Sequence, residues 1–162
     1  MANRFRVGGT VWDDGVNGWS TTSGGAAGSA DPTAADDVLF DGNSGAGTVS
    51  INAVALCRSF NSTGYTGTIA GASILRIGDA TAGNITLGSG MTWSHTGSIE
   101  LRSTTGVNTI TPNGISLPSL RLRVNGGSWQ LLGALTLTGA AGLDWLLSTG
   151  TFDTNGQTLT TT

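Results

Sequence analysis

The chain has no lysine and few charged residues of any kind. Its seven basic residues are all arginine, and ten Asp and Glu residues leave a formal net charge of −3. Charged residues make up 10% of the 162 positions, against roughly 25% in an ordinary globular domain. Because nucleic acids and anionic membrane surfaces both require clustered positive charge, we expect neither as a partner.

Cysteine, histidine and long apolar runs are also scarce. A single cysteine, Cys57, excludes an internal disulfide, and its apolar setting predicts a small buried side chain, with a reactive or intermolecular thiol as the alternative. The only histidine, His95, lies among Ser and Thr and is predicted at the surface. No stretch has the apolar segment of a secretory signal or the roughly 18 apolar residues of a membrane span, which predicts synthesis in the cytoplasm and no membrane partner.

What the chain does have is a repeat of apolar residues at intervals of about 22. Three interleaved ladders run through its second half. The first ladder contains Ile69, Trp93, Ile115, Leu137 and Leu159. The second contains Ile77, Leu101, Val124 and Leu147, and the third contains Leu87, Ile110, Leu131 and Phe152. A chain that coils once per repeat would stack these residues into three internal columns.

Short alternating segments support this interpretation. Ile74–Ile77 and Leu120–Val124 alternate apolar and polar residues, which is typical of strands with one buried face. Gly or Asn separates nearly every pair of such segments and suits tight corners. The sequence therefore predicts an all-β fold, a short three-sided, right-handed parallel β-helix of about 22 residues per coil. The alternative is a β-sandwich, with antiparallel hairpins at Asn113-Gly114 and Asn125-Gly126.

The first 35 residues differ from the rest. We predict an irregular N-terminal arm or cap over residues 1–35 and a β-helix body over residues 36–162. Trp12 and Trp19 lie seven residues apart among glycines and are expected to pin the irregular segment onto a surface. Asp36–Asp41 is the first predicted strand, and the segment from Val49 to Phe60 is expected to form a first, irregular coil.

Residues that could carry chemistry are few. Asp79 and Glu100 are 21 positions apart and could lie on adjacent coils, while glycoside cleavage needs two carboxyl groups about 5–10 Å apart. The favoured interpretation is a surface ion-pair ladder, in which each pair contributes only about 0–1 kcal/mol. The arginines of this ladder would be Arg76, Arg102 and Arg123. We therefore predict that the protein is not an enzyme.

Two acidic, glycine-containing segments raise the question of calcium. Residues 13–17 and 41–45 place oxygen ligands beside glycines, but neither has the spacing of an EF-hand loop. Turns formed by Asp and Asn side chains are the favoured interpretation. No metal and no cofactor is predicted.

The N-terminal region resembles the opening of many bacterial and phage β-helix proteins. The residues that carry the resemblance, within residues 5–60, are Val7-Gly8-Gly9, Trp12, Asn17, Trp19-Ser20, Pro32 and Asp36-Asp37-Val38-Leu39-Phe40. This stretch is similar to the head of autotransporter passenger domains, of large repeat adhesins and of small phage structural proteins. The absence of a signal peptide and of a C-terminal membrane barrel favours the phage version.

The resemblance implies a structural role. The expected function is that of a virion surface protein of a tailed bacteriophage, a decoration or cement protein of the capsid or part of a fibre, located in the virion. The expected assembly is a homotrimer, and the expected partner is the major capsid protein or another virion protein. The alternative is a carbohydrate-binding or adhesive β-helix module that takes a surface glycan. Trp129 and Trp145 are candidates for stacking on a sugar ring.

The predicted partner-binding residues lie in the N-terminal segment. They are Arg4, Phe5, Arg6, Trp12 and Trp19. In one interpretation these residues form an arm that docks on the capsid or on a neighbouring subunit. In the other, the segment is a cap that folds back on the strand at Asp37–Asp41.

Overall fold

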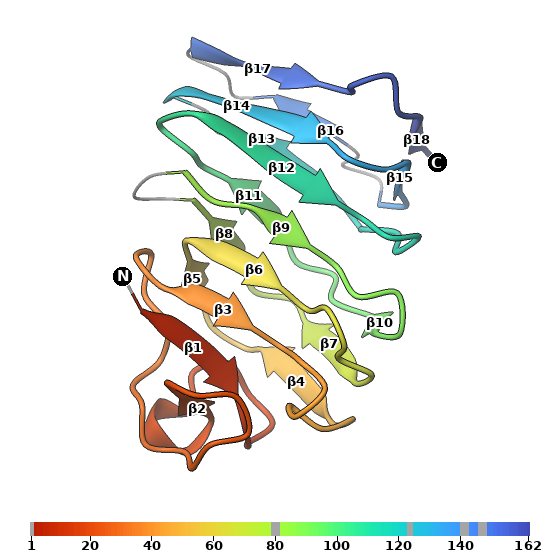
Figure 1. The fold of residues 1–162 in the computed structure, drawn as a ribbon. Coiled ribbons are helices and arrows are strands. Elements are labelled where there is room, and N and C mark those ends of the chain that lie inside the picture. Colours follow the sequence, from red (N-terminus) through yellow and green to blue (C-terminus); the bar gives the residue numbers. More distant parts are fainter. Residues whose placement is uncertain (1, 79–81, 123–124, 140–142, 146–148) are drawn as a thin grey trace.

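The computed structural model describes residues 2–78, 82–122, 125–139, 143–145 and 149–162. Almost all of its regular structure is β, and a single short 3₁₀ turn, η1 (Gly15–Asn17), is the only helical element in the described part of the chain. The strands stack into a β-solenoid of about 5 turns with about 23 residues per coil (Figure 1).

Three sides of the solenoid are built from parallel strands. The first side is an eight-stranded sheet that contains β1 (Asn3–Arg6), β2 (Trp19–Ser20), β3 (Asp37–Leu39), β6 (Ser59–Asn61), β9 (Ile85–Thr86), β12 (Val107–Thr111), β14 (Asn125–Leu131) and β17 (Thr149–Asp153). The second side contains β4 (Thr48–Ile51), β7 (Thr68–Gly71) and β10 (Thr92–Trp93), and then the pair β15 (Leu135–Leu137) and β18 (Leu159–Thr161). The third side contains β5 (Ala55–Cys57), β8 (Leu75–Ile77), β11 (Ile99–Leu101), β13 (Leu120–Leu122) and β16 (Leu143–Trp145).

Strand pairing confirms the parallel β-helix and shows that the sandwich alternative is wrong. Among the described strands, only β1 and β2 pair antiparallel. Asn113 has a φ of 50° in the turn after β12, but no hairpin forms there. Asn125 and Gly126 begin β14, which pairs in parallel with β12 and β17.

The predicted ladders are correct over some steps and displaced by two residues over others. Ile69 pairs with Trp93, Ile77 with Leu101, and Ile110 with Leu131, as predicted. The displaced steps pair Ile85 with Ile110, Leu101 with Leu122, Leu117 with Leu137, Leu135 with Leu159, and Trp129 with Phe152. Val124 and Leu147 lie outside the described residues. A displacement of two keeps a residue on the same face of its strand, because side chains alternate with a period of two.

The first coil is regular, contrary to the prediction for Val49–Phe60. Val38 pairs with Phe60, Val49 with Ile69, and Cys57 with Ile77. The coils here approach closely at Gly71, whose φ is +103°. A Cβ on Gly71 would lie 2.4 Å from the carbonyl oxygen of Ile51 in the coil below, so glycine is required at this corner.

The interior is a continuous stack of apolar side chains. Ile77 and Leu101 are fully buried, as are their counterparts Ile85 and Ile110 on another side. Each coil covers the apolar residues of its neighbours, and the hydrophobic stabilisation is about 25 cal/mol for each Å² removed from water. A defect in one coil therefore exposes the coils on both sides of it.

Leu101→Asp should unfold the solenoid. The carboxylate would replace a fully buried side chain that lies in register with Ile77, and it would have no partner there, at a cost of several kcal/mol. The matched control is Leu132→Asp, because Leu132 is 48% exposed and its replacement should change stability by less than about 0.5 kcal/mol. Thermal unfolding followed by circular dichroism measures both; equal melting temperatures for the two variants would contradict the assigned register.

Candidate functional site

The N-terminal segment closes one end of the solenoid. Strand β1 pairs in parallel with β3, with Arg4 opposite Val38 and Phe5 opposite Leu39, and pairs antiparallel with β2 on its other edge. The segment therefore adds two strands, β1 and β2, to the large sheet (Figure 1). This pairing folds the segment back on the Asp37–Asp41 strand, as the cap interpretation describes.

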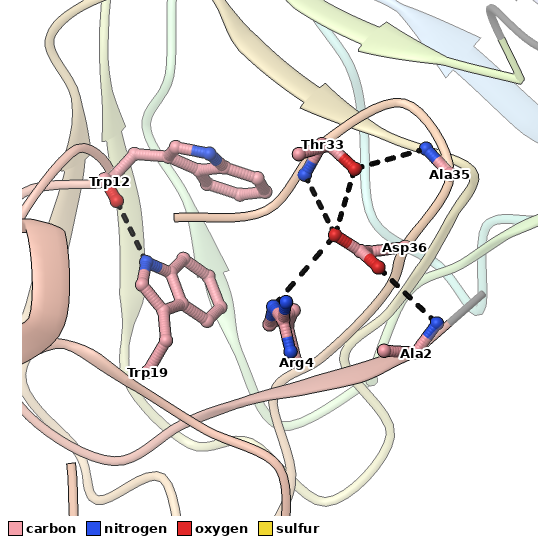
Figure 2. Close-up of polar contacts among 7 residues, drawn as sticks. All are labelled: Ala2, Arg4, Trp12, Trp19, Thr33, Ala35 and Asp36. Carbon is pink, nitrogen blue, oxygen red and sulfur yellow. Dashed lines mark hydrogen bonds and ion pairs between the residues drawn. The ribbon is translucent and has the colours of Figure 1, made fainter. Parts of the chain in front are cut away.

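An aromatic cluster lies beneath the cap. Trp12 and Trp19 pack edge to face with ring centroids 5.2 Å apart, and the indole Nε1 of Trp19 donates a hydrogen bond of 2.9 Å to the carbonyl oxygen of Trp12 (Figure 2). Trp12 also stacks on Phe60 at 6.4 Å, and Trp19 packs edge-on against Phe40 at 5.8 Å. The two tryptophans thus cover the N-terminal end of the apolar interior, at the first coil.

Arg6 is a buried cation within this cap. It is 1% exposed, its guanidinium lies 5.0 Å from the centre of the Trp19 ring, and its Nη2 lies 3.5 Å from Oδ2 of Asp14. Burial lowers the pKa of Arg6, an effect opposed by the negative charge of Asp14. A Cβ on Gly18 would lie 2.4 Å from Nη1 of Arg6, so the chain encloses the guanidinium closely.

Asp36 fixes the first residues of the cap against the turn at Thr33. Its carboxylate accepts hydrogen bonds from the backbone N–H and the hydroxyl of Thr33, at 3.1 and 2.9 Å, and from the backbone N–H of Ala2 at 3.2 Å (Figure 2). Arg4 Nε lies 3.8 Å from the same carboxylate. Burial on its own would raise the pKa of Asp36, but the Thr33 hydrogen bonds, then the charge of Arg4 and the Ala2 bond, outweigh it and hold the pKa below its usual value.

The structure brings the five predicted partner-binding residues together, mostly on the inside of the cap. Arg6, Trp12 and Trp19 are buried by the chain itself, whereas Arg4 and Phe5 are partly exposed. Sequence reasoning missed Asp36 as the residue that organises this end. The signal available was Thr33 three positions before Asp36, a spacing typical of side-chain-bonded turns.

A ladder of alternating charge runs along the third side of the solenoid. In-register pairing places Arg76 beside Glu100, Glu100 beside Arg121, and Arg121 beside Asp144. Nitrogen–oxygen distances are 3.0 Å for Arg76–Glu100 and 3.6 Å for Arg121–Asp144. The predicted ladder is thus confirmed for Arg76 and for Arg102, which lies 4.0 Å from Glu100.

Two members of the predicted ladder, Asp79 and Arg123, lie outside the described residues, and with Asp79 so does the carboxylate pair that was considered for glycoside cleavage. Glu100 itself is 2% exposed and lies between arginines. A carboxylate this enclosed has the surroundings of a structural charge rather than of a substrate-facing acid.

Four other residues that the sequence singled out have separate outcomes. His95 is buried, contrary to the surface prediction. Its Nε2 lies 2.7 Å from the carbonyl oxygen of Ser73, and burial lowers its pKa, an effect opposed by that bond. Trp129 is fully buried and therefore offers no exposed ring for a sugar, and the side chain of Trp145 is not among those described. Cys57 is buried as predicted, and burial raises the pKa of its thiol.

The acidic segment at Asp41 forms the predicted turn, since Oδ1 of Asp41 accepts a hydrogen bond from the backbone N–H of Asn43 at 2.9 Å.

Within the described ranges, no three His, Cys, Asp or Glu side chains are grouped as metal ligands would be. The same residues include no helix with the length and apolarity needed to cross a membrane.

Asp36→Ala should destabilise the protein at neutral pH by about 2–3 kcal/mol, because several hydrogen bonds to a charged group are lost. The lowered pKa means that the native state favours the carboxylate. Its contribution is therefore complete above the unfolded value of about 4 and is lost as the pH falls through the native pKa. The difference between the melting temperatures of wild type and variant should begin to shrink below about pH 4 and should shrink further as the pH falls through the native pKa. The control is Asp13→Ala, an exposed carboxyl group of the same cap; a gap that stays constant down to pH 2.5 would contradict this assignment.

Asp14→Asn should cost more stability than Arg6→Met. Removing Asp14 leaves a buried cation without its counter-charge, whereas an apolar side chain of similar length removes the buried charge altogether. The double variant should be more stable than Asp14→Asn alone, which a double-mutant cycle in denaturant measures. Strict additivity of the two changes would show that the pair does not interact.

Comparison with known proteins adds no relative to this geometry. No family model, no curated protein and no solved structure matches the chain. Function is therefore argued from the cap, the stacked coils and the exposed faces of the solenoid.

Proposed function

We propose that this chain is a structural protein of the particle surface of a tailed phage, where it decorates or cements the capsid or forms part of a fibre. The single observation that carries the proposal concerns the head motif. Trp12, Trp19 and Phe40, which belong to the stretch resembling phage β-helix proteins, pack as one unit over the end of the first coil. The motif thus has a physical purpose in this chain, which is to start a solenoid.

The mechanics of the solenoid support a passive, load-carrying role. Backbone hydrogen bonds run from coil to coil on three sides. The apolar columns run along the same axis, as does the charge ladder that begins at Arg76 and ends at Asp144. Stability in such a stack is a sum of interactions between neighbouring coils. A rod of this kind keeps its shape while presenting flat side faces, which suits a component that must fit a fixed lattice of other subunits.

We further propose that the protein assembles as a homotrimer on the particle. Among the described residues, β16 and β18 each pair on one side only. Edge strands with free N–H and C=O groups favour further pairing, and another copy of the chain would supply it. The major capsid protein, or another virion protein, is the proposed partner outside the trimer.

Attachment to that partner is proposed to use the outer side of β1. Arg6, Trp12 and Trp19 are covered by the cap and Arg4 is paired with Asp36, so a docking surface that leaves the cap folded must use the partly exposed Phe5. Phe5 lies beside Leu39 on the same outer face. Phe5 is the apolar side chain that this docking surface presents at the closed end of the solenoid.

The second candidate is a carbohydrate-binding or adhesive module. One observation favours it, a polar groove beside β1 on the outer face of the large sheet. The two functions are compatible, because a particle protein can also bind a glycan.

The structural role is tested in particles produced by the source genome. Mass spectrometry of purified particles should detect the chain at stoichiometric, not trace, abundance. Phe5→Asp should leave the melting temperature nearly unchanged and reduce uptake into particles at least about tenfold, which corresponds to about 1.4 kcal/mol of binding. The control is Val16→Asp, because Val16 is 58% exposed in the same cap.

Two results would count against the proposal. Particles that contain no copy of the chain would refute the structural role itself. Particles that take up Phe5→Asp as well as wild type would refute attachment through β1 and leave the structural role standing. Mass photometry of the isolated protein measures the trimer separately.

A further inference from the structure

The outer face of the large sheet carries a groove near its closed end. The groove has a volume of about 300 Å³ and crosses four neighbouring strands, β1, β3, β6 and β9. Its polar lining includes Asn3, Asp37, Arg58, Ser59, Asn61 and Asn84. These side chains do not belong to the apolar columns, and the fold needs none of them as core.

Parallel register sorts the lining into two rows. Asp37 lies between Asn3 and Ser59 in one row, and Leu39 lies beside Asn61 in the other. The first row is polar throughout, whereas Leu39 gives the second row an apolar strip. The groove therefore offers hydrogen-bonding groups along both rows and one apolar side chain, Leu39, in the second.

Two amide donors in the groove are held in fixed orientations. Oδ1 of Asn61 accepts the backbone N–H of Thr63 at 2.9 Å, and Oδ1 of Asn84 accepts the backbone N–H of Thr109 at 2.8 Å. Since the oxygen of each amide is bound, the orientation of its Nδ2 is set. Neither Nδ2 has a hydrogen-bond partner within the part of the chain that the structure describes. Hydrogen bonding of a ligand to these two Nδ2 groups costs little side-chain entropy in the protein, because both amides are already ordered.

The charges in the groove cancel. The guanidinium of Arg58 and the carboxylate of Asp37 form an ion pair with each other. A charged ligand would therefore find no unmatched counter-charge, whereas a neutral ligand with many hydroxyl groups would meet amide and hydroxyl groups that can donate and accept. A volume of about 300 Å³ is at the lower end of small-molecule sites.

Strand addition by a peptide does not fit this place. The four strands that line the groove are interior to an eight-stranded sheet and pair on both edges, so their backbone groups are already used. Recognition must come from side chains projecting outward. We propose that this groove binds a short stretch of a neutral saccharide, with hydroxyl oxygens accepting from the Asn61 and Asn84 amides and an apolar sugar face on Leu39. This inference rests on the second candidate function, the carbohydrate-binding module, and does not depend on the role in a phage particle.

The test is saccharide binding by the full chain. The probe is an array of neutral oligosaccharides from bacterial surface polysaccharides and from plant and animal glycans, followed by calorimetry with each one bound. The test variant is Asn61→Asp/Asn84→Asp. It keeps the two Oδ1 atoms that accept hydrogen bonds from the backbone N–H groups of Thr63 and Thr109, and it removes both Nδ2 donors. The control is Asn52→Asp, which adds a charge in an exposed turn away from the groove.

Wild type should bind at least one neutral saccharide at millimolar or lower concentration. The double variant should bind it about tenfold more weakly or worse, with an unchanged melting temperature, and Asn52→Asp should bind like wild type. Which part of the array binds identifies the source of the glycan. The proposal is overturned if no saccharide binds at millimolar concentration. It is also overturned if the variant that lacks both amide donors binds the saccharide as tightly as wild type. Uptake of the double variant into particles should be normal, so failure here is distinct from failure of the structural role.

Discussion

The whole molecule depends on one constraint, the stacking of each inward apolar side chain on its counterpart one coil away. Leu75, Ile99 and Leu120 lie in register on three successive coils, and the backbone pairing that holds them in register is the same pairing that forms the sheet. Burial and hydrogen bonding are therefore coupled. A side chain that does not fit one column disturbs both, because the strand that carries it can move only by breaking its ladder.

This constraint also explains the two ends. At the first coil there is no preceding coil to cover the column, and the cap supplies aromatic rings in its place. Trp12 stacks over Phe60, and Trp19 packs against Phe40. Closing the end in this way buries a cation, Arg6, which contacts the Trp19 ring and Asp14. The outer faces carry no such constraint and are free to vary, which is where the charge ladder and the polar groove are found.

Periodicity was sufficient to predict the fold and insufficient to predict the register. Val49 and Ile69 are 20 residues apart, whereas Phe60 and Ile85 are 25 apart, so no single repeat length fits every coil. A two-residue displacement leaves the apolar pattern intact, and the Leu87 and Ile115 assignments went wrong in this way. The prediction of an irregular first coil failed for the same reason, because its shorter spacing broke the assumed phase.

The site was less predictable than the fold. His95 lies two positions after Trp93 and therefore shares its face of the chain, so alternation could have placed it inside; its polar neighbours concealed this. Arg6 and Asp36 look like surface charges in sequence, and only the folded cap shows them enclosed. The groove could not be foreseen at all, since Asn3, Asp37 and Asn61 belong to three different strands and Asn84 directly precedes a fourth. Their proximity follows from register, which the sequence left uncertain.

Backbone nuclear Overhauser effects across the third side of the solenoid test this account most directly. Ile99 should show contacts to the strands of both Leu75 and Leu120, in the evenly spaced pattern of parallel pairing. Short Hα–Hα contacts on either side of Asn113-Gly114 would instead indicate an antiparallel hairpin, and they would contradict the stacked columns on which every other conclusion rests.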